Sequence, residues 1–307
     1  AGLGRTLGTG FLPFAASNYS QLENIKSGVG EWNLVLGNSI SNSLITGYTT
    51  NNENRGDPGT LFPFVDVLAA DGTTYASFGT EPFTPNNELL FHTFQFQDNV
   101  TKFSDRHSLT FGFAMQRYQS DNSFFNCCKQ GAYVYNSLAD FYADANGFLA
   151  NPSRTTSTIT PRRYQVRWMN IPGLDKPLQT LQVVSGGGYA QDEWRPRANV
   201  TVTAGVRFDV AKFGNTTYPN PAVDALTFRD ENGKAVQYQS GHLPDPKLLW
   251  SPRGAVNWDV TGKQDTQVRV GTGIFSGPPP YVWVSNQIGQ TGILTGFDQL
   301  DNTTARP

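Results

Sequence analysis

Apolar and polar residues alternate along several stretches of the chain with a period of two. In the clearest stretch, apolar residues occupy every second position from Val200 to Val210, and polar or small residues lie between them. Residues 109–116, 250–260 and 268–274 show the same pattern. Successive side chains of a β-strand point to opposite faces, so each stretch predicts a strand with one apolar face. That face meets either the core of a soluble sandwich or the lipid around an outer-membrane barrel.

Together with weaker stretches, the pattern predicts eight strands that are joined in pairs by short polar turns. The expected strands cover residues 30–39, 43–50, 87–100, 108–118, 179–194, 200–210, 249–260 and 266–275. The expected turns cover residues 40–42, 102–107, 195–199 and 261–265. The strand at 179–194 alternates poorly around Gly186, Gly187 and Gly188. Consecutive glycines in a strand indicate a bulge, a bend or a close backbone approach.

The connections between the predicted hairpins are long. We expect loops near residues 51–86, 119–178, 211–248 and 276–307. Loops of this length are uncommon in compact domains, whereas outer-membrane barrels combine short periplasmic turns with long extracellular loops. The regular order of short and long connections therefore favours a barrel over a sandwich. Within the second loop, a short helix is expected over residues 138–145, ending at Gly147.

Composition agrees with a surface that partly faces lipid. Charged residues make up 16% of the chain and aromatic residues 13%, whereas soluble domains carry about 25% charged residues. The net charge of −2 provides no basic stripe for nucleic acid. No apolar run approaches the roughly 18 residues of a membrane-spanning helix. Aromatic residues near strand ends are candidates for an interfacial girdle: Trp32, Trp194, Trp250, Trp258 and Tyr189.

Both ends of the chain look cut. Residues 1–5 carry no secretion signal, and residues 302–307 contain no terminal strand. The two cysteines, Cys127 and Cys128, are adjacent. Adjacent cysteines can form a strained disulfide, but the favoured interpretation is a pair of loop cysteines without special chemistry, because metal-ligand spacing is missing.

Three groups of short motifs occur in order between about residues 87 and 290. The first comprises Asp98-Asn99-Val100-Thr101 and His107-Ser108-Leu109-Thr110-Phe111-Gly112. The second comprises residues 189–194, 199–201 and 205–209, and the third comprises residues 251–254, 269–275 and 278–286. These motifs resemble signature hairpins of TonB-dependent outer-membrane receptors. The chain is most similar to the Oar-like branch, whose members carry an N-terminal carboxypeptidase-regulatory-like domain.

The resemblance implies a bacterial outer-membrane location and a barrel of about 22 strands, closed by an N-terminal plug and energised through TonB. The chain shows no plug domain, TonB box or regulatory domain, and its strands make up about a third of such a barrel. We therefore expect residues 1–307 to form one partial, all-β, antiparallel transmembrane barrel domain. The expected partners are outer-membrane lipid, the plug and the remaining barrel strands, the TonB complex through the missing N-terminal part, and an unidentified solute.

Candidate functional residues lie on the polar face of the predicted strands and in the last loop. Five charged residues share the polar face and are candidates for contact with the plug or a passing ligand: Arg207, Asp209, Arg253, Asp259 and Arg269. The alternative for them is a structural ion-pair network between adjacent strands. Tyr281 and Trp283 follow three prolines in a predicted extended segment. They are candidates for ligand contact at the outer mouth, and packing of that loop is the alternative.

The residues provide no candidate catalytic group, cofactor site or metal site. His92, His107 and His242 do not combine with serine, cysteine or aspartate into a known catalytic order, and Asp192 and Glu193 point to opposite faces of a strand. We therefore expect no enzyme.

The expected function is that of part of a TonB-dependent transporter importing a siderophore, glycan or peptide, with adhesion or export as other roles of the intact protein. Two rival hypotheses remain. One is a small complete outer-membrane or surface β protein that acts in binding or adhesion without TonB. The other is a soluble secreted all-β binding domain.

Overall fold

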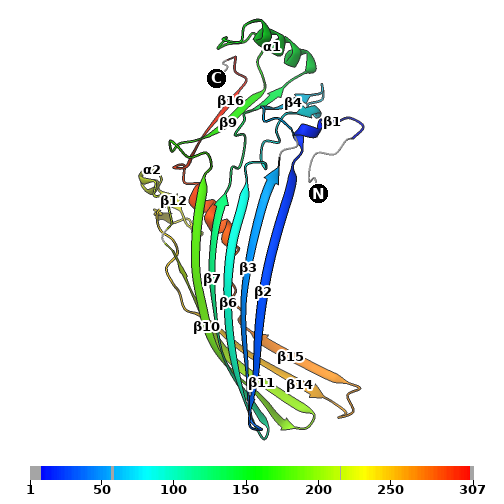
Figure 1. Cartoon of the computed structure of the whole chain (residues 1–307), viewed down its shortest axis with the longest axis vertical. Coiled ribbons are helices and arrows are strands. Elements are labelled where there is room, and N and C mark those ends of the chain that lie inside the picture. Colours follow the sequence, from blue (N-terminus) through cyan, green and yellow to red (C-terminus); the bar gives the residue numbers. More distant parts are fainter. Residues whose placement is uncertain (1–7, 57–58, 215, 305–307) are drawn as a thin grey trace.

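The structure is a computed structural model that describes residues 8–56, 59–214 and 216–304. Long strands form one curved sheet, and the connections at one end of it fold into a second, smaller sheet (Figure 1). In the described part of the chain, no helix is long and apolar enough to cross a membrane. The predictions about the chain ends concern residues that, apart from 302–304, lie outside the described residues.

The large sheet is an eight-stranded meander in which each strand pairs with its neighbours along the chain. Its strands are β2 (Ser20–Leu36), β3 (Ile40–Gly56), β6 (Glu88–Ser104), β7 (His107–Ser123), β10 (Leu178–Arg197), β11 (Val200–Phe213), β14 (Leu249–Asp259) and β15 (Gln267–Gly273). All neighbouring pairs are antiparallel. The prediction of eight strands in hairpins is confirmed. Within the described residues, β2 and β15 are the open edges of this sheet.

The first short turn lies at Gly37–Ser39, so the prediction of a turn at residues 40–42 is wrong. Ile40 already belongs to β3 and pairs with Leu36. Gly37 has a φ of +59°, in the left-handed region that glycine adopts without a steric penalty. The glycine, rather than the polar residues after it, therefore sets this turn. The other short connections are Asp105–Arg106, Ala198–Asn199 and residues 260–266.

Strand β10 continues through its three glycines without a bulge and pairs on both sides. The register shift lies elsewhere, between Trp194 and Arg197. The glycines instead permit close approach. A β-carbon at Gly187 would overlap the Asp209 side chain, and one at Gly188 would lie 2.9 Å from the Phe208 ring.

The two faces of the sheet differ as the alternation predicts. We call the face that carries Val206 and Phe208 the outer face, and the face that carries Arg207 and Asp209 the inner face. On β7, which is joined to β11 through β10, Phe111 and Phe113 belong to the outer face and are 55% and 50% exposed. Exposed aromatic rings on one face of a sheet are expected where that face meets lipid.

On the outer face, the apolar positions form a band that ends before the strands reach the long connections. On β7, the outward positions are apolar from Leu109 to Met115 and then become polar at Arg117. The interval from His107 to Met115 matches the 9–11 residues or so that a tilted strand needs to cross a bilayer. Strands of 17 to 20 residues, such as β2 and β10, therefore extend beyond the lipid at the end that carries the long connections.

Four of the five girdle candidates belong to the outer face by register and are exposed: Trp32, Trp194, Trp250 and Trp258. The prediction for Tyr189 is wrong. Its register partners are Gly112 and Arg207, so it belongs to the inner face.

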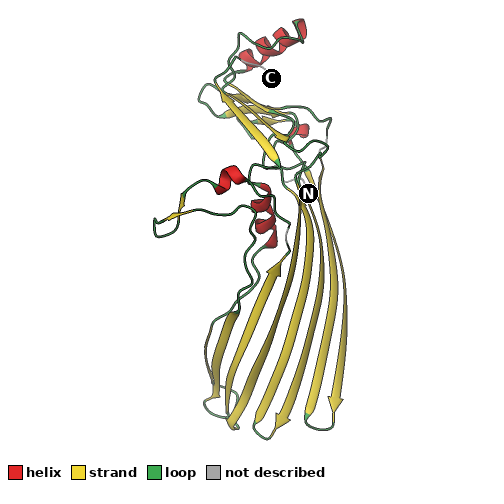
Figure 2. Ribbon diagram, turned by 90° about the vertical axis from the view of Figure 1, so that its left-hand side faces the viewer, coloured by secondary structure: helices red, strands yellow, loops and turns green. Residues whose placement is uncertain are grey.

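Three of the long connections fold together, with residues that precede β2, rather than forming irregular loops. They build a six-stranded sheet that, with α1 (Leu138–Ala150), we call the loop module (Figures 1 and 2). Its strands, in spatial order, are β1 (Leu12–Pro13), β5 (Thr74–Phe78), β4 (Phe64–Leu68), β8 (Ala132–Tyr135), β9 (Arg163–Met169) and β16 (Thr295–Asp301). The remaining connection carries α2 (Pro221–Asp224) and a small hairpin of β12 (Phe228–Arg229) and β13 (Ala235–Val236).

The adjacent cysteines lie inside the loop module and are joined by a disulfide. Cys127 and Cys128 are buried against Phe64 and Ala132. Cys128 has a φ of +66°, as one of the few non-glycine residues in the left-handed region. The interpretation as cysteines without special chemistry is therefore corrected to a vicinal disulfide in a buried turn.

Helix α1 begins as predicted but continues past Gly147 to Ala150. The Ser137 side chain caps its N-terminus by accepting a hydrogen bond from the amide of Asp140 (3.1 Å). Gly147 allows the Arg154 guanidinium to approach, because a β-carbon there would lie 2.8 Å from Arg154 Nη1. The glycine thus serves packing rather than helix termination.

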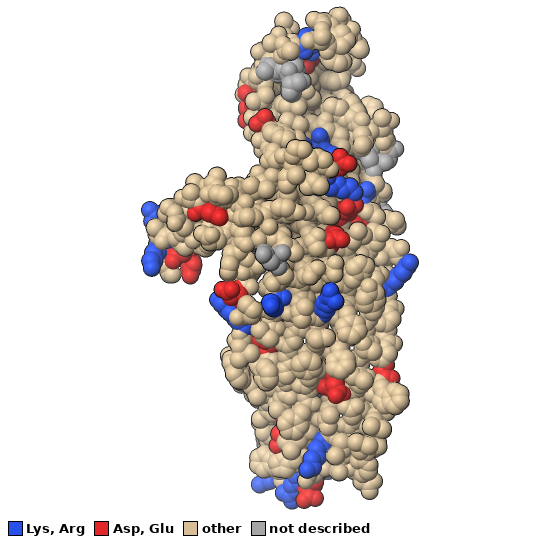
Figure 3. Space-filling model, turned by 60° about the vertical axis from the view of Figure 1, so that its left-hand side comes forward, with Lys and Arg blue, Asp and Glu red and all other residues tan. Residues whose placement is uncertain are grey.

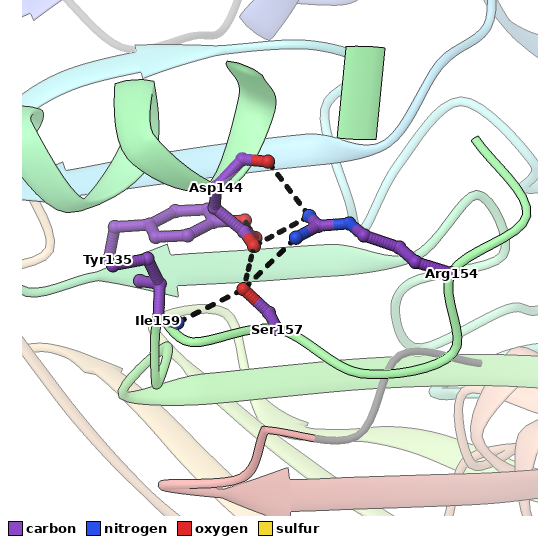
Figure 4. A network of polar contacts seen from close by, with 5 residues as sticks. All are labelled: Tyr135, Asp144, Arg154, Ser157 and Ile159. Carbon is purple, nitrogen blue, oxygen red and sulfur yellow. Dashed lines mark hydrogen bonds and ion pairs between the residues drawn. The ribbon is translucent and has the colours of Figure 1, made fainter. Parts of the chain in front are cut away.

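A buried carboxylate joins α1 to the rest of the loop module (Figure 4). Asp144, 3% exposed, accepts hydrogen bonds from Tyr135 Oη (2.6 Å), Arg154 Nη2 (2.7 Å) and the Ser157 hydroxyl. Arg154 Nη2 also donates to the Asp144 carbonyl (2.8 Å). Burial of a charge is costly unless it is paired and hydrogen-bonded, and this network meets both conditions.

Candidate functional site

The inner face of the large sheet bounds a cavity of about 740 Å³. Seven strands contribute to its wall: β2 through Val29, β3, β6, β7, β10, β11, and β14 through Leu249. The opposite side is formed by residues around Pro244–Leu249 and by the segment from Ser276 to Val284. The volume lies within the range of about 300–1,000 Å³ that is usual for ligand pockets.

Helix α3 (Tyr281–Gly289) packs against this inner face. Figure 2 shows it between the sheet and the connection that carries α2. Tyr281 and Ile288, 9% and 5% exposed, form one buried cluster with Tyr118, Leu181 and Val183. A nine-residue helix is marginal in water by itself, so this packing is what stabilises it.

The helix corrects the prediction of an extended segment around Tyr281 and Trp283. Only the three prolines are non-helical, and Pro280 is the N-cap residue of α3. Proline favours helix starts because its fixed φ suits the first turn and its missing N–H is not needed there. Tyr281 lines the cavity, and its ring lies 4.7 Å from that of Tyr118. Trp283 is 67% exposed and is not among the residues that line the cavity.

Four charged residues line the cavity: Arg207, Asp209, Asp245 and Lys247. Arg207 and Asp209 form an ion pair within β11. Arg207 donates to Asp209 through Nε (2.8 Å to Oδ2) and Nη2 (2.6 Å to Oδ1). The guanidinium also lies 5.6 Å from the centre of the Tyr189 ring. Tyr189 on β10 in turn donates a hydrogen bond across β7 to Asn99 Oδ1 on β6. Two-point pairing of this kind fixes the direction of both charged groups.

Two glycines make room for this cluster. A β-carbon at Gly112 would overlap the Tyr189 ring, and one at Gly187 would overlap the Asp209 carboxylate. Because each glycine lies directly opposite the residue it accommodates, the side chains lie flat against the sheet. The side chains of Tyr189, Arg207 and Asp209 therefore form an ordered polar layer and leave the space of the cavity free.

The other charged candidates share the inner face by register but stay apart from the cavity. Asp259 accepts hydrogen bonds from the amides of Gly262 (3.1 Å) and Gln264 (2.9 Å) in the last short turn. Arg269 donates to Gln267 Oε1 (2.6 Å). The Arg253 side chain forms no hydrogen bond or ion pair with another described residue. Arg207 and Asp209 therefore line the cavity, whereas the remaining three do not.

Several lining residues carry no charge and were not singled out from the sequence. Three amide side chains project from the inner faces of β6 and β7: Gln95, Gln97 and Gln116. The alternation of glutamine and phenylalanine from Phe94 to Gln97 was the available signal. Phe213 and Val284 add apolar surface to the same cavity.

One histidine–carboxylate pair was also not predicted from the sequence. His107 Nδ1 is 2.7 Å from Asp192 Oδ2, and the imidazole stacks on Trp194. The pair belongs to the outer face beside the short turns. Glu193 belongs to the inner face, so the prediction that Asp192 and Glu193 point to opposite faces is confirmed. Among the described residues, no group of three or more His, Cys, Asp or Glu side chains is placed to hold a metal ion.

These features define an antiparallel β-barrel protein of the bacterial outer membrane. Residues 5–306 match the family model described as outer membrane beta barrel domain, and the chain belongs to that family. The fold is similar to the crystal structure of the outer membrane transporter YddB from Escherichia coli, with a TM-score of 0.53 and 13% sequence identity. The match covers 97% of this chain and 31% of the transporter. No curated protein sequence matches the chain.

Proposed function

We propose that the chain forms part of the barrel wall of an Oar-like, TonB-dependent outer-membrane transporter that imports a bulky solute. The inner-face cavity is the observation that carries this proposal. It combines a volume of about 740 Å³ with apolar walls and a few ordered polar groups, as is common in binding sites for small molecules. The three ordered motif groups of the sequence support the TonB-dependent branch.

The cavity wall supplies groups suited to a neutral, polar solute. Gln95, Gln97 and Gln116 offer both hydrogen-bond donors and acceptors. Tyr281 and Phe213 offer flat apolar surface beside them. Arg207 is already paired with Asp209. Asp245 and Lys247 add one charge of each sign to the lining, so the wall presents little net charge. Within the classes of siderophore, glycan and peptide, this lining favours solutes rich in hydroxyl or amide groups.

The proposal includes further parts of the transporter as partners. The edge strands β2 and β15 leave backbone N–H and C=O groups that need partners in lipid, where each unsatisfied group costs several kcal/mol. We infer that further barrel strands pair with these edges, and that a plug domain faces the inner side. Coupling to TonB would then run through the plug. The proposal includes no enzymatic step.

Growth of a deletion strain tests the proposal. The strain that lacks the gene is compared with its parent on ferric siderophores, oligosaccharides or peptides as the limiting source of iron, carbon or nitrogen. We expect one source to become unusable, and we expect a strain without TonB to show the same defect. A defect that persists without any TonB requirement would contradict the energised mechanism. Equal growth of both strains on all sources would contradict import.

One observation favours adhesion as a second candidate function. Helix α1 lies at the end of the loop module farthest from the short turns (Figure 1). Its apolar residues Leu138, Tyr142 and Leu149 are 38%, 57% and 74% exposed and share one helix face. Replacing all three by serine should abolish cell attachment if the module is an adhesin. Unchanged attachment would rule out this surface.

A further inference from the structure

Two basic residues lie side by side at the upper limit of the apolar band on the outer face. Arg117 on β7 and Lys212 on β11 are both opposite Val184 on β10. Neighbouring strands are about 4.8 Å apart, so the two α-carbons are about 10 Å apart. Both side chains are exposed, and Val184 between them is 48% exposed.

Among the described residues, neither charged side chain takes part in a hydrogen bond or an ion pair. The nearest carboxylates of the same face on β6 and β7 are Asp98 and Asp121. Asp98 pairs with Phe113, four positions below Arg117, and Asp121 lies four positions above it. Four residues of a strand correspond to about 13 Å. The positive charge of this pair is therefore not neutralised locally.

The surroundings of the pair change abruptly from apolar to polar. Met115 and Val210 lie directly below the two cations, both in register with Gly186. Gln119 lies above Arg117 on the same face. In Figure 3, Lys and Arg side chains lie in a row above a broad band with few charged side chains. Cations at this height meet the headgroups of the leaflet on the side of the long connections.

We propose that Arg117 and Lys212 form a binding site for a phosphate group of an outer-leaflet lipid. The phosphate lies over Val184, between the guanidinium and the ammonium, and acyl chains follow the apolar positions below. Arginine pairs with phosphate oxygens in a bidentate manner, and lysine adds a point charge. Such a lipid fixes the height of the strands in the membrane and is independent of solute import.

Lipid binding to the full-length protein in neutral detergent tests the proposal. The probe is lipid A, a glucosamine disaccharide lipid with two phosphates, and the comparison is the same lipid after removal of both phosphates. Each cation near a membrane surface contributes enough for the double variant Arg117→Gln with Lys212→Gln to bind about 30-fold more weakly. Arg117→Lys with Lys212→Arg preserves both charges and should retain binding within a few-fold.

Lys102 provides a matched control because it is exposed on the same face near the short turns, at the opposite rim of the apolar band. Lys102→Gln should leave binding unchanged. Heat-modifiable migration on gels verifies that each variant is folded. Equal binding of phosphorylated and dephosphorylated lipid would overturn the proposal. So would a double variant that binds as the wild type does, or an equal loss in Lys102→Gln.

Discussion

Replacement of Ile288 by alanine should release helix α3 from the inner face. Ile288 is 5% exposed and packs with Leu181 and Val183, which are 0% and 1% exposed. Truncating a buried isoleucine to alanine costs about 2–5 kcal/mol, since the lost contacts leave a cavity. A loss of about 3 kcal/mol in docking raises the undocked fraction roughly 150-fold. The short helix has little stability of its own, so it should also unwind when undocked.

Hydrogen–deuterium exchange of the full-length protein in detergent measures this release. Amides of residues 281–289 should exchange much faster in Ile288→Ala than in the wild type. Gly289→Val should act in the same direction, because a β-carbon at Gly289 would overlap the buried Gln179 side chain. Gln287 is exposed on the same helix, so Gln287→Ala is the control. Unchanged exchange in Ile288→Ala, or equal acceleration in Gln287→Ala, would refute packing as the cause of docking.

Three further predictions concern the loop module and the polar layer beside the cavity. Arg154→Ala leaves the buried Asp144 carboxylate without its cation, so the loop module should lose about 3–5 kcal/mol and become sensitive to limited proteolysis; resistance equal to the wild type would contradict this. Gly112→Val should displace the Tyr189 ring and cost about 1–3 kcal/mol, seen as a lower temperature for the gel-mobility shift of the barrel. Burial, with Tyr133 and Asp298 nearby, raises the pKa of Tyr164 to about 12. The neutral phenol is thus favoured by folding, and the loop module should lose stability between about pH 10, the unfolded pKa, and pH 12; Tyr164→Phe should remove that part of the loss in a melting series.

The strands of the membrane band were predictable because lipid on one face and water on the other impose a strict period of two. Their full lengths were not, because above the band both faces meet water or protein. On β7, the outward residues Arg117, Gln119 and Asp121 are as polar as the inward ones, so the alternation disappears although the strand continues to Ser123. Six observed strands, β2, β3, β6, β7, β10 and β11, therefore extend past a predicted end, whereas β14 and β15 are slightly shorter than predicted.

Local patterns in the sequence did not predict the loop module. Its strands have two to seven residues. Although β4 and β5 form a local hairpin, other pairings join segments far apart along the chain, as when β9 pairs with β16. The cluster of Tyr189, Arg207 and Asp209 beside the cavity could not be predicted, for a similar reason. Only the register reveals that Tyr189, Gly112 and Arg207 lie side by side. The alternation of side chains along each strand placed Arg253, Asp259 and Arg269 on the correct face. It gave no information on their distance from the cavity.

Solute uptake by cavity-blocking variants tests the central claim most directly. Ala211 lines the cavity on the inner face of β11, and Val206 belongs to the outer face of the same strand. The assay follows uptake of the nutrient on which the deletion strain fails to grow. Ala211→Trp should fill the cavity and abolish uptake, whereas Val206→Trp should preserve it. Full uptake by Ala211→Trp, with normal amounts of folded protein in the outer membrane, would contradict a solute path along this face.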